Sequence, residues 1–238
     1  MNAPRTTEHG QPIGPALDFA PAVLPTPVVL TGRGVRLEPV AREHTAGLYA
    51  ALSSKRDDNL WTYRSDERPA TVAEMTARIE RYAAAPGVVT FAIVPTETGQ
   101  AAGLASLMRA DAANGSVEVG SIVYGRALQR SRGATEAMSL LMRHVFEDLG
   151  YRRYEWKCDK HNQPSRRAAV RLGFIWEGRF RNAVVYKGRS RDTDWFSITD
   201  AEYPRVRRAL DEWLDDRNFD DHGNQRVRLA ARPANPEA

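Results

Sequence analysis

A run of apolar side chains with a helical period constrains the fold of this chain more than any other feature. The spacing i, i+3, i+4, i+7 predicts one long amphipathic helix, formed by Ala134, Ala137, Met138, Leu141, Met142, Val145, Phe146 and Leu149. Gly150, directly after the last of them, is typical of a helix end. Segments 116–124 and 152–159, on the two sides of this helix, read as strands. The chain is therefore expected to mix helices and strands.

The other elements follow from the same patterns. We expect strands at 35–40, 88–94, 101–111, 174–188 and 191–198, and helices at 44–53, 71–85, 162–173 and 199–217. Thr71 with Glu74 and Asn162 are predicted helix caps, and the last helix is expected to start at a Thr199 or Asp200 cap. This order, with mixed strand directions, indicates an α+β fold in one domain over 32–219, between an extended arm (1–31) and a polar tail (220–238).

Charge and composition narrow the function classes. The net charge of +4 favours anionic partners, but the chain lacks the dense basic tracts of a nucleic-acid binder. A single cysteine, Cys158, excludes an intramolecular disulfide and suits a reducing compartment. The apolar stretch 17–30 is interrupted by prolines, so we predict neither a signal peptide nor a membrane segment and expect a cytoplasmic protein. The five histidines show no metal-ligand spacing, and no metal is expected.

The start of the long helix carries an unusual charge pattern. Arg130, Ser131, Arg132 and Gly133 precede it, although cations are unfavourable at the positive end of a helix dipole. The unpaired N–H groups of a first helical turn bind anions such as a pyrophosphate, and arginine side chains would strengthen that binding. Small residues would let oxygen atoms approach the backbone, and hydroxyls would add hydrogen bonds; the residues in question are Gly133, Ala134, Ser131 and Thr135. The alternative is a solvated, polar helix start.

Two motifs in this region resemble the cofactor-binding core of the GNAT superfamily of acyl-CoA N-acyltransferases, in particular its RimJ/RimL-like branch. Gln129 and Ala134 occupy the ends of the family's loop Q/R-x-x-G-x-G/A, with Arg132 where the family often has its first glycine. The second motif, N-x-x-S followed by L-G-F, is present as Asn162, Ser165, Leu172, Gly173 and Phe174. The resemblance covers about residues 33 to 200. It implies a mixed, mostly antiparallel sheet of about seven strands flanked by helices.

The resemblance also implies acetyl-CoA as the acyl donor. Its pyrophosphate would lie on the N–H groups between Arg130 and Thr135, and Asn162 would cap its helix and bond the pantetheine amides. The pantetheine arm would pair like an added strand with the backbone of Ile122, Val123 and Tyr124. The complete predicted cofactor set is Ile122, Val123, Tyr124, Gln129, Arg130, Ser131, Arg132, Gly133, Ala134, Thr135, Asn162 and Ser165.

Two residues are candidates for the chemistry that the resemblance implies, a direct attack of an amine on the thioester. Glu118 would act as the base, through a water; the alternative is a structural carboxylate paired with an arginine. Many family members use a tyrosine to protonate the departing thiolate, but that position is Ala169 here. Ser165, in the first turn of its helix, is expected to take this task, unless it is an ordinary helix-start serine.

The acceptor side is less defined. Trp61 and Tyr63 are expected either to line the acceptor pocket or to pack on the core, and Tyr186 belongs to an arginine-rich hairpin that is either an acceptor wall or a charged sheet edge. The predicted function is acetyl transfer from acetyl-CoA to a primary amine of a protein, a peptide or a small molecule. The alternative is a non-catalytic acyl-CoA-binding regulatory module. The sequence leaves open whether two copies form a homodimer.

Overall fold

The computed structural model describes residues 5–229 and 231. Its strands are β1 (Arg5–Thr6), β2 (Pro12–Ile13), β3 (Leu30–Thr31), β4 (Val35–Pro39), β5 (Val89–Pro95), β6 (Gly103–Asp111), β7 (Ser116–Tyr124), β8 (Arg153–Asp159), β9 (Ile175–Tyr186) and β10 (Arg189–Thr199). Its helices are α1 (Thr45–Leu52), α2 (Val72–Ala83), α3 (Arg132–Arg143), α4 (Gln163–Arg171) and α5 (Tyr203–Leu214), with short helical turns η1 (Arg42–His44), η2 (Lys55–Trp61), η3 (His144–Asp148) and η4 (Asp216–Asn218).

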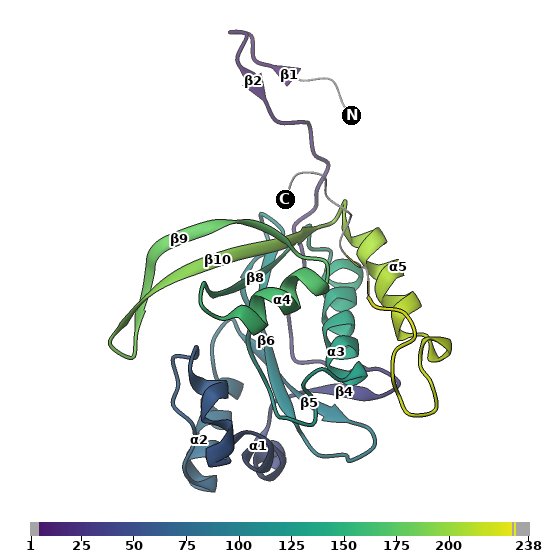
Figure 1. Cartoon of the computed structure of the whole chain (residues 1–238). Coiled ribbons are helices and arrows are strands. Elements are labelled where there is room, and N and C mark those ends of the chain that lie inside the picture. Colours follow the sequence, from purple (N-terminus) through teal and green to yellow (C-terminus); the bar gives the residue numbers. More distant parts are fainter. Residues whose placement is uncertain (1–4, 230, 232–238) are drawn as a thin grey trace.

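One mixed sheet organises the molecule (Figure 1). It has eight strands in the order β3-β4-β5-β6-β7-β8-β10-β9. Within the described residues β7 and β8 form the one parallel pair, joined by the crossover through α3, and the other neighbours are antiparallel. This confirms the predicted α+β fold with a mostly antiparallel sheet. The sheet has eight strands rather than about seven because Leu30 and Thr31, at the end of the predicted arm, pair with β4 as β3.

The sheet separates two apolar cores. Alternate residues of β5 show this directly: Phe91 and Ile93 face the core under α3, α4 and α5, whereas Ala92 and Val94 face the core under α1 and α2. All four side chains are at most 2% exposed. Period-2 alternation on a strand buried on both faces therefore produces a three-layer arrangement, with helices on each side of the sheet (Figure 1).

Local capping determines where the helices begin. The Oγ1 atom of Thr71 accepts the Glu74 N–H (3.2 Å) at the start of α2, which confirms the predicted cap. The last helix was expected from Thr199 or Asp200, and that boundary is wrong. Thr199 ends β10, and its N–H and hydroxyl both bond to the Glu202 carboxylate, so that α5 begins at Tyr203. The long helix begins at Arg132 and ends in the π-helical turn η3.

Two hairpins project from the molecule, whereas the C-terminal segment packs against it. The hairpin of β1 and β2 projects away from the rest of the molecule, and so does the outer part of the β9–β10 hairpin (Figure 1). The predicted polar tail instead returns to the domain: Ala231 is fully buried beside Gly173, and its carbonyl accepts from Arg205 Nη1 (2.5 Å). Residues 232–238 of that predicted tail lie outside the described residues. No helix in the part of the chain that the structure describes is long and apolar enough to cross a bilayer.

Candidate active site

Strands β7 and β8 pair along only part of their length. Ser116 to Val119 pair with Arg153 to Trp156. Beyond that point, within the described residues, β7 pairs only with β6 and β8 only with β10. A bulge marks the point of separation, where Ser121 has a φ of 53° and the β6–β7 register shifts. On the β8 side, the backbone of 120–124 therefore has no strand partner among the described residues. An unpaired strand edge inside a sheet can accept an extended ligand.

The three predicted pantetheine-binding residues occupy this edge. Val123 is buried in the core under α1 and α2, and Ile122 is half-buried. The Tyr124 hydroxyl is buried without a partner among the described residues, and this burial raises the pKa of Tyr124 well above its usual value. Gln129 Nε2 donates to the Tyr124 carbonyl (2.8 Å), so Gln129 joins the end of β7 to the loop before α3.

The first turn of α3 follows this edge after the loop 125–131. Ser131 caps it: its Oγ accepts the Ala134 N–H (3.1 Å) and donates to the Leu128 carbonyl (2.7 Å). Among the described residues, no acceptor faces the N–H groups of Arg132 and Gly133. The structure thus brings the loop predicted for pyrophosphate binding next to the unpaired edge of β7, with two backbone donors available for an anion.

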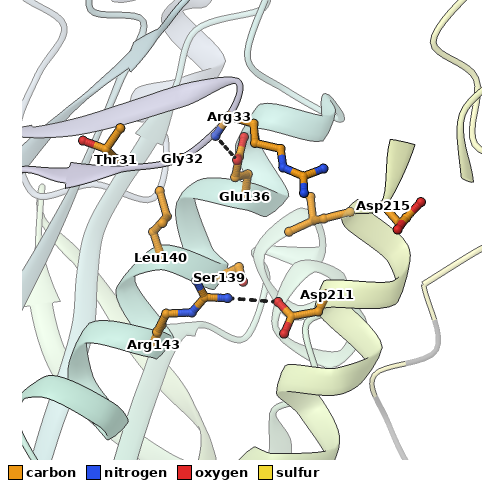
Figure 2. A pocket seen from close by; sticks show the side chains of 10 residues that line it. Thr31, Gly32, Arg33, Glu136, Ser139, Leu140, Arg143, Asp211 and Asp215 are labelled. Atoms are coloured by element: carbon orange, nitrogen blue, oxygen red, sulfur yellow. Dashed lines mark hydrogen bonds and ion pairs between the residues drawn. The ribbon is translucent and has the colours of Figure 1, made fainter. Parts of the chain in front are cut away.

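Gly133 is required by packing. A Cβ at this position would lie 2.8 Å from Val35 Cγ1 on β4, so a side chain would push α3 away from the sheet. The sequence suggested a different reason, close approach of ligand oxygens. Glu136, one turn further, ties α3 to the turn between β3 and β4. Its carboxylate accepts the Arg33 N–H (2.6 Å; Figure 2) and the Gly34 N–H (2.9 Å). Packing at Gly133 and the hydrogen bonds of Glu136 therefore fix the start of α3 against β4 and the β3–β4 turn.

The two arginines of the loop have different surroundings. The Arg132 guanidinium turns to the C-terminal segment, where it pairs with Asp216 (2.5 Å), donates to the Leu214 carbonyl and lies 4.4 Å from the centre of the Phe219 ring. Arg130 is exposed, has a φ of 58° and has no acidic partner among the described side chains. Of the two side chains predicted to face an anion, only that of Arg130 has no other ion-pair partner in the described part of the chain.

The hydroxyl of Thr135 is also engaged elsewhere. Thr135 is 4% exposed, and its Oγ1 accepts from Arg171 Nη1 (3.0 Å) at the end of α4. Arg171 in turn lies over the ring of Trp213 on α5. Thr135 therefore links α3 to α4 through its side chain. Its predicted contribution to anion binding would have to come from its backbone.

The second motif lies at the end of β8 and the start of α4. Asn162 Oδ1 accepts the Ser165 N–H (3.2 Å), which confirms Asn162 as the cap of α4. Ser165 Oγ accepts from Trp156 Nε1 (2.9 Å), so its own hydroxyl hydrogen is available to another acceptor. Burial raises the pKa of the neighbouring Cys158 thiol to about 11, with the Ser165 hydroxyl partly opposing this. Cys158 is a small buried side chain and stays protonated near neutral pH.

Glu118 lies on the opposite face of the sheet from Trp156. Its side chain is 5% exposed, and its Oε2 lies 2.6 Å from Arg109 Nη1 and 2.8 Å from Lys157 Nζ. Lys157 also pairs with Glu155 (2.9 Å). The structure therefore places Glu118 beside the point where β7 and β8 separate, in a buried ion pair with two cations. This geometry is the one expected of the structural alternative.

The three predicted acceptor residues lie in different surroundings. Trp61 is 2% exposed and its Nε1 donates to the Leu52 carbonyl (3.0 Å), so its indole belongs to the core under α1 and α2. The Tyr63 hydroxyl donates to the His161 carbonyl (3.0 Å). The Tyr186 hydroxyl donates to Asp159 Oδ2 (2.9 Å); burial, and then this hydrogen bond, raise the pKa of Tyr186. The segment after η2 and the β9–β10 hairpin thus meet at the end of β8.

Sequence reasoning missed Asp159. It is the last residue of β8, it is 5% exposed, and it accepts from both Tyr186 and the His161 N–H (2.8 Å). The available signal was an acidic residue at the end of an apolar strand, three residues before the cap Asn162. That signal is weak, because only the tertiary structure shows that β7 has left this part of β8.

A hollow of about 530 Å³ lies further along α3, between the β3–β4 turn and α5 (Figure 2). Three of its charged side chains are already engaged: Arg143 pairs with Asp211 (3.1 Å), and Glu136 accepts the Arg33 N–H (2.6 Å). None of the predicted site residues lines it. Within residues 5–229 and 231, no three His, Cys, Asp or Glu side chains are placed to hold a metal ion.

Comparison with known proteins agrees with this geometry. Residues 35–175 match the acetyltransferase (GNAT) domain family, so the chain belongs to the GNAT acetyltransferases. A crystal structure of a GCN5-related N-acetyltransferase from Brucella melitensis is 43% identical, with a TM-score of 0.87 over 89% of this chain and 96% of that one. A GNAT-family structure from Chromobacterium violaceum is 32% identical, with a TM-score of 0.74 over 81% of this chain and 98% of that one.

Two further relatives extend the comparison. The N-acetyltransferase p20 of Bacillus licheniformis, whose function is uncharacterised, is 33% identical over 113 residues. This match spans 48% of the present chain and 63% of p20, less than two thirds of that relative. The microcin C7 self-immunity acetyltransferase MccE, solved with acetyl-CoA and AMP, is 23% identical with a TM-score of 0.60 over 71% of this chain and 93% of that one. At that identity MccE shares the fold.

Proposed function

We propose that the protein transfers an acetyl group from acetyl-CoA to a primary amine. One observation carries the proposal: the backbone of 120–124 has no strand partner on the β8 side among the described residues, and residues 125–131 join it to the first turn of α3, where the Arg132 and Gly133 N–H groups have no partner in the same part of the chain. An extended amide chain ending in a diphosphate matches such an edge followed by such a helix start. MccE, which shares the fold, was solved with acetyl-CoA.

The predicted contacts with acetyl-CoA would follow one another along β7 and the start of α3. The N–H groups of Arg132 and Gly133 and the side chain of Arg130 would hold the diphosphate. The backbone of Ile122 to Tyr124 would pair with the pantetheine arm, and the thioester would then lie between β7 and the start of α4, near Ser165. The amine would approach from the opposite face of the sheet, where Glu118 and the Tyr186 hairpin lie.

A titration of thermal stability tests the cofactor. Coenzyme A and acetyl-CoA at 100 times their dissociation constant should stabilise the fold by about 2.7 kcal/mol, roughly 5 to 10 °C for a domain of this size. NAD at the same concentration serves as the control nucleotide, because it has a diphosphate but no pantetheine. Equal stabilisation by NAD, or none by coenzyme A, would contradict the proposal. Stabilisation without acetylation of any amine would favour the non-catalytic binding module.

Replacing Ser165 with alanine should lower kcat about tenfold, with the dissociation constant of acetyl-CoA unchanged. Because Ser165 Oγ accepts from Trp156 Nε1, its hydrogen would be the one to turn from the neighbouring Cys158 to the departing thiolate, and one such hydrogen bond contributes about 1.5 kcal/mol. Rapid-quench measurements with a primary amine would report the chemical step. Thr76→Ala, which removes a hydroxyl on the surface of α2, is the matched control. An unchanged kcat would leave Ser165 as an ordinary helix-start serine.

Both roles that the sequence suggested for Glu118 remain part of the proposal. As a base it would act on the amine through a water. As a structural carboxylate it would neutralise Arg109 and Lys157, and its two short ion pairs support this second role. The two roles predict different effects of Glu118→Gln on stability and on pH dependence.

The finer assignments rest on the motifs. The Gln129–Ala134 loop and the Asn162–Phe174 motif support membership of the RimJ/RimL-like branch. The acceptor classes we propose are the N-terminal amine of a protein or peptide and the amine of a small molecule. The lone, buried Cys158 supports a cytoplasmic location, because a buried free thiol needs no oxidising compartment.

A further inference from the structure

Asp159 differs from the other buried acids of this protein. Four acidic side chains are buried in the part of the chain that the structure describes: Asp57, Glu118, Asp159 and Asp194. Three of them have cationic partners within 3 Å; these pairs are Asp57–Arg126, Glu118–Arg109, Glu118–Lys157, Asp194–Arg166 and Asp194–Arg179. No described cationic side chain lies within 4 Å of the Asp159 carboxylate. Burying a carboxylate without a counter-charge lowers the stability of the fold, so we expect a functional reason for the burial of Asp159.

The position of Asp159 provides that reason. The last β8 residue paired with β7 is Trp156, and Asp159 lies three residues beyond it, where β7 has separated. Trp156 and Cys158 face the core under α3 and α4, so by strand alternation Lys157 and Asp159 face the other side. Lys157 contacts Glu118 there. Asp159 therefore faces the side from which the amine would approach, just past the end of the paired segment.

The carboxylate of Asp159 is held in a defined orientation. The His161 N–H donates to Oδ1 (2.8 Å), and the Tyr186 hydroxyl donates to Oδ2 (2.9 Å). Tyr63, from the segment after η2, fixes the same turn by donating to the His161 carbonyl (3.0 Å). A carboxylate can accept about four hydrogen bonds, so two lone-pair directions remain for a ligand.

The charged groups around Asp159 are engaged with other partners. Lys160, the next residue, pairs with Asp192 (2.8 Å). On the hairpin, Arg189 donates to the Thr62 carbonyl (2.8 Å) and lies over the Tyr186 ring, and Arg191 donates to Thr193 (3.1 Å). Lys157, two residues earlier on β8, pairs with Glu118 and Glu155. The negative charge of Asp159 thus remains available to a positive group from outside the chain.

We propose that Asp159 receives the ammonium group of the acceptor and takes its proton. This rests on the proposed acetyl transfer and gives to Asp159 the task that the sequence suggested for Glu118. The amine lone pair then forms the C–N bond with the acetyl carbonyl carbon. The C–S bond breaks with its electron pair on sulfur, and the second proton of the attacking nitrogen passes to that thiolate. Overall, ammonium and thioester yield amide, thiol and one proton, which Asp159 releases to water.

The test compares Asp159→Asn, Asp159→Glu and Asp192→Asn, a nearby carboxylate already paired with Lys160. The assay uses acetyl-CoA with a hexapeptide bearing a free α-amine, spermidine and tyramine, each over a range of pH. For Asp159→Asn we expect kcat/KM for the amine to fall at least about 100-fold and the acidic limb of the pH profile to move up to the pKa of the amine, because only the neutral amine can then attack. Asp159→Glu should keep that limb at a reduced rate, and Asp192→Asn should resemble the unmodified protein.

Stability and cofactor binding give a second readout. Asp159→Asn removes an unpaired buried charge, so its melting temperature should be equal to or higher than that of the unmodified protein, with coenzyme A affinity unchanged. A fully active Asp159→Asn protein with an intact acidic limb overturns this proposal alone. A marked loss of stability also overturns it, because Asp159 would then be a structural group. If the unmodified protein acetylates none of the amines, the proposed function fails and this proposal fails with it.

Discussion

Replacing Arg130 with glutamate is expected to weaken coenzyme A binding about 100-fold while leaving the stability of the ligand-free protein almost unchanged. Arg130 is exposed and has no acidic partner among the described residues, so the fold does not depend on its charge. A charge-assisted bond to a diphosphate contributes about 1.5 to 3 kcal/mol, and a carboxylate in its place adds repulsion. The expected total of about 3 kcal/mol corresponds to about two orders of magnitude in the dissociation constant.

The design of this experiment follows from the difference between the two loop arginines. Arg132 is unsuitable, because its replacement would also break the pair with Asp216 and the contact with Phe219. Isothermal titration at two salt concentrations measures the affinity, and the difference between variants should shrink at high salt. Arg42→Glu, an exposed arginine paired with Glu80, controls for net charge. If Arg130→Glu and Arg42→Glu bind coenzyme A equally well, the diphosphate does not lie at the start of α3.

The second large effect is on stability: Glu118→Gln should lower the free energy of unfolding by about 3 kcal/mol. Glu118 is 5% exposed on its side chain and neutralises Lys157, which is itself only 10% exposed. Removing one partner of a buried pair leaves a charge without compensation, and such changes cost about 3 to 5 kcal/mol. We take the lower end because Lys157 retains Glu155 and because Arg109 is largely exposed.

Chemical denaturation of Glu118→Gln measures this loss, and Glu118→Gln/Lys157→Met should recover part of it, because the second change removes the uncompensated charge. Glu43→Gln, on the surface turn η1, is the control. If Glu118 is structural, the acidic limb of the pH profile survives in Glu118→Gln. Unchanged stability together with an acidic limb that has moved up to the pKa of the amine would instead make Glu118 the base and leave Asp159 with another task.

Sequence periodicity and capping predicted most elements because both act between neighbours along the chain. The cap at Asn162 lies three residues from the Ser165 N–H that it accepts. The start of α5 shows where such rules fail. Thr199 is a good cap residue, but it is the last residue of β10 and pairs with Arg153 on β8. The helix therefore starts after Glu202. Tertiary pairing overrides a local preference when the strand offers more hydrogen bonds.

Some residues of the candidate site could be named from the sequence because they are neighbours along the chain. The loop from Gln129 to Thr135 and the Asn162–Ser165 turn are continuous motifs, so their residues could be named before their surroundings were known. The ion pair of Arg132 with Asp216 could not be predicted from the sequence, because 84 residues separate the two. The same holds for Trp61, whose indole could line a pocket or fill the core, and which packs in the core under α1 and α2.

By itself, the sequence determined most helices and strands and the polar start of α3, and it suggested the anionic ligand that we propose for that start. These depend on interactions within a few residues, which the order of side chains specifies directly. Only the tertiary structure decided where β7 leaves β8, and that Arg130 and the buried Asp159 have no ion-pair partner among the residues the structure describes. Each of these depends on which distant segments meet, and that is set by the packing of the whole sheet.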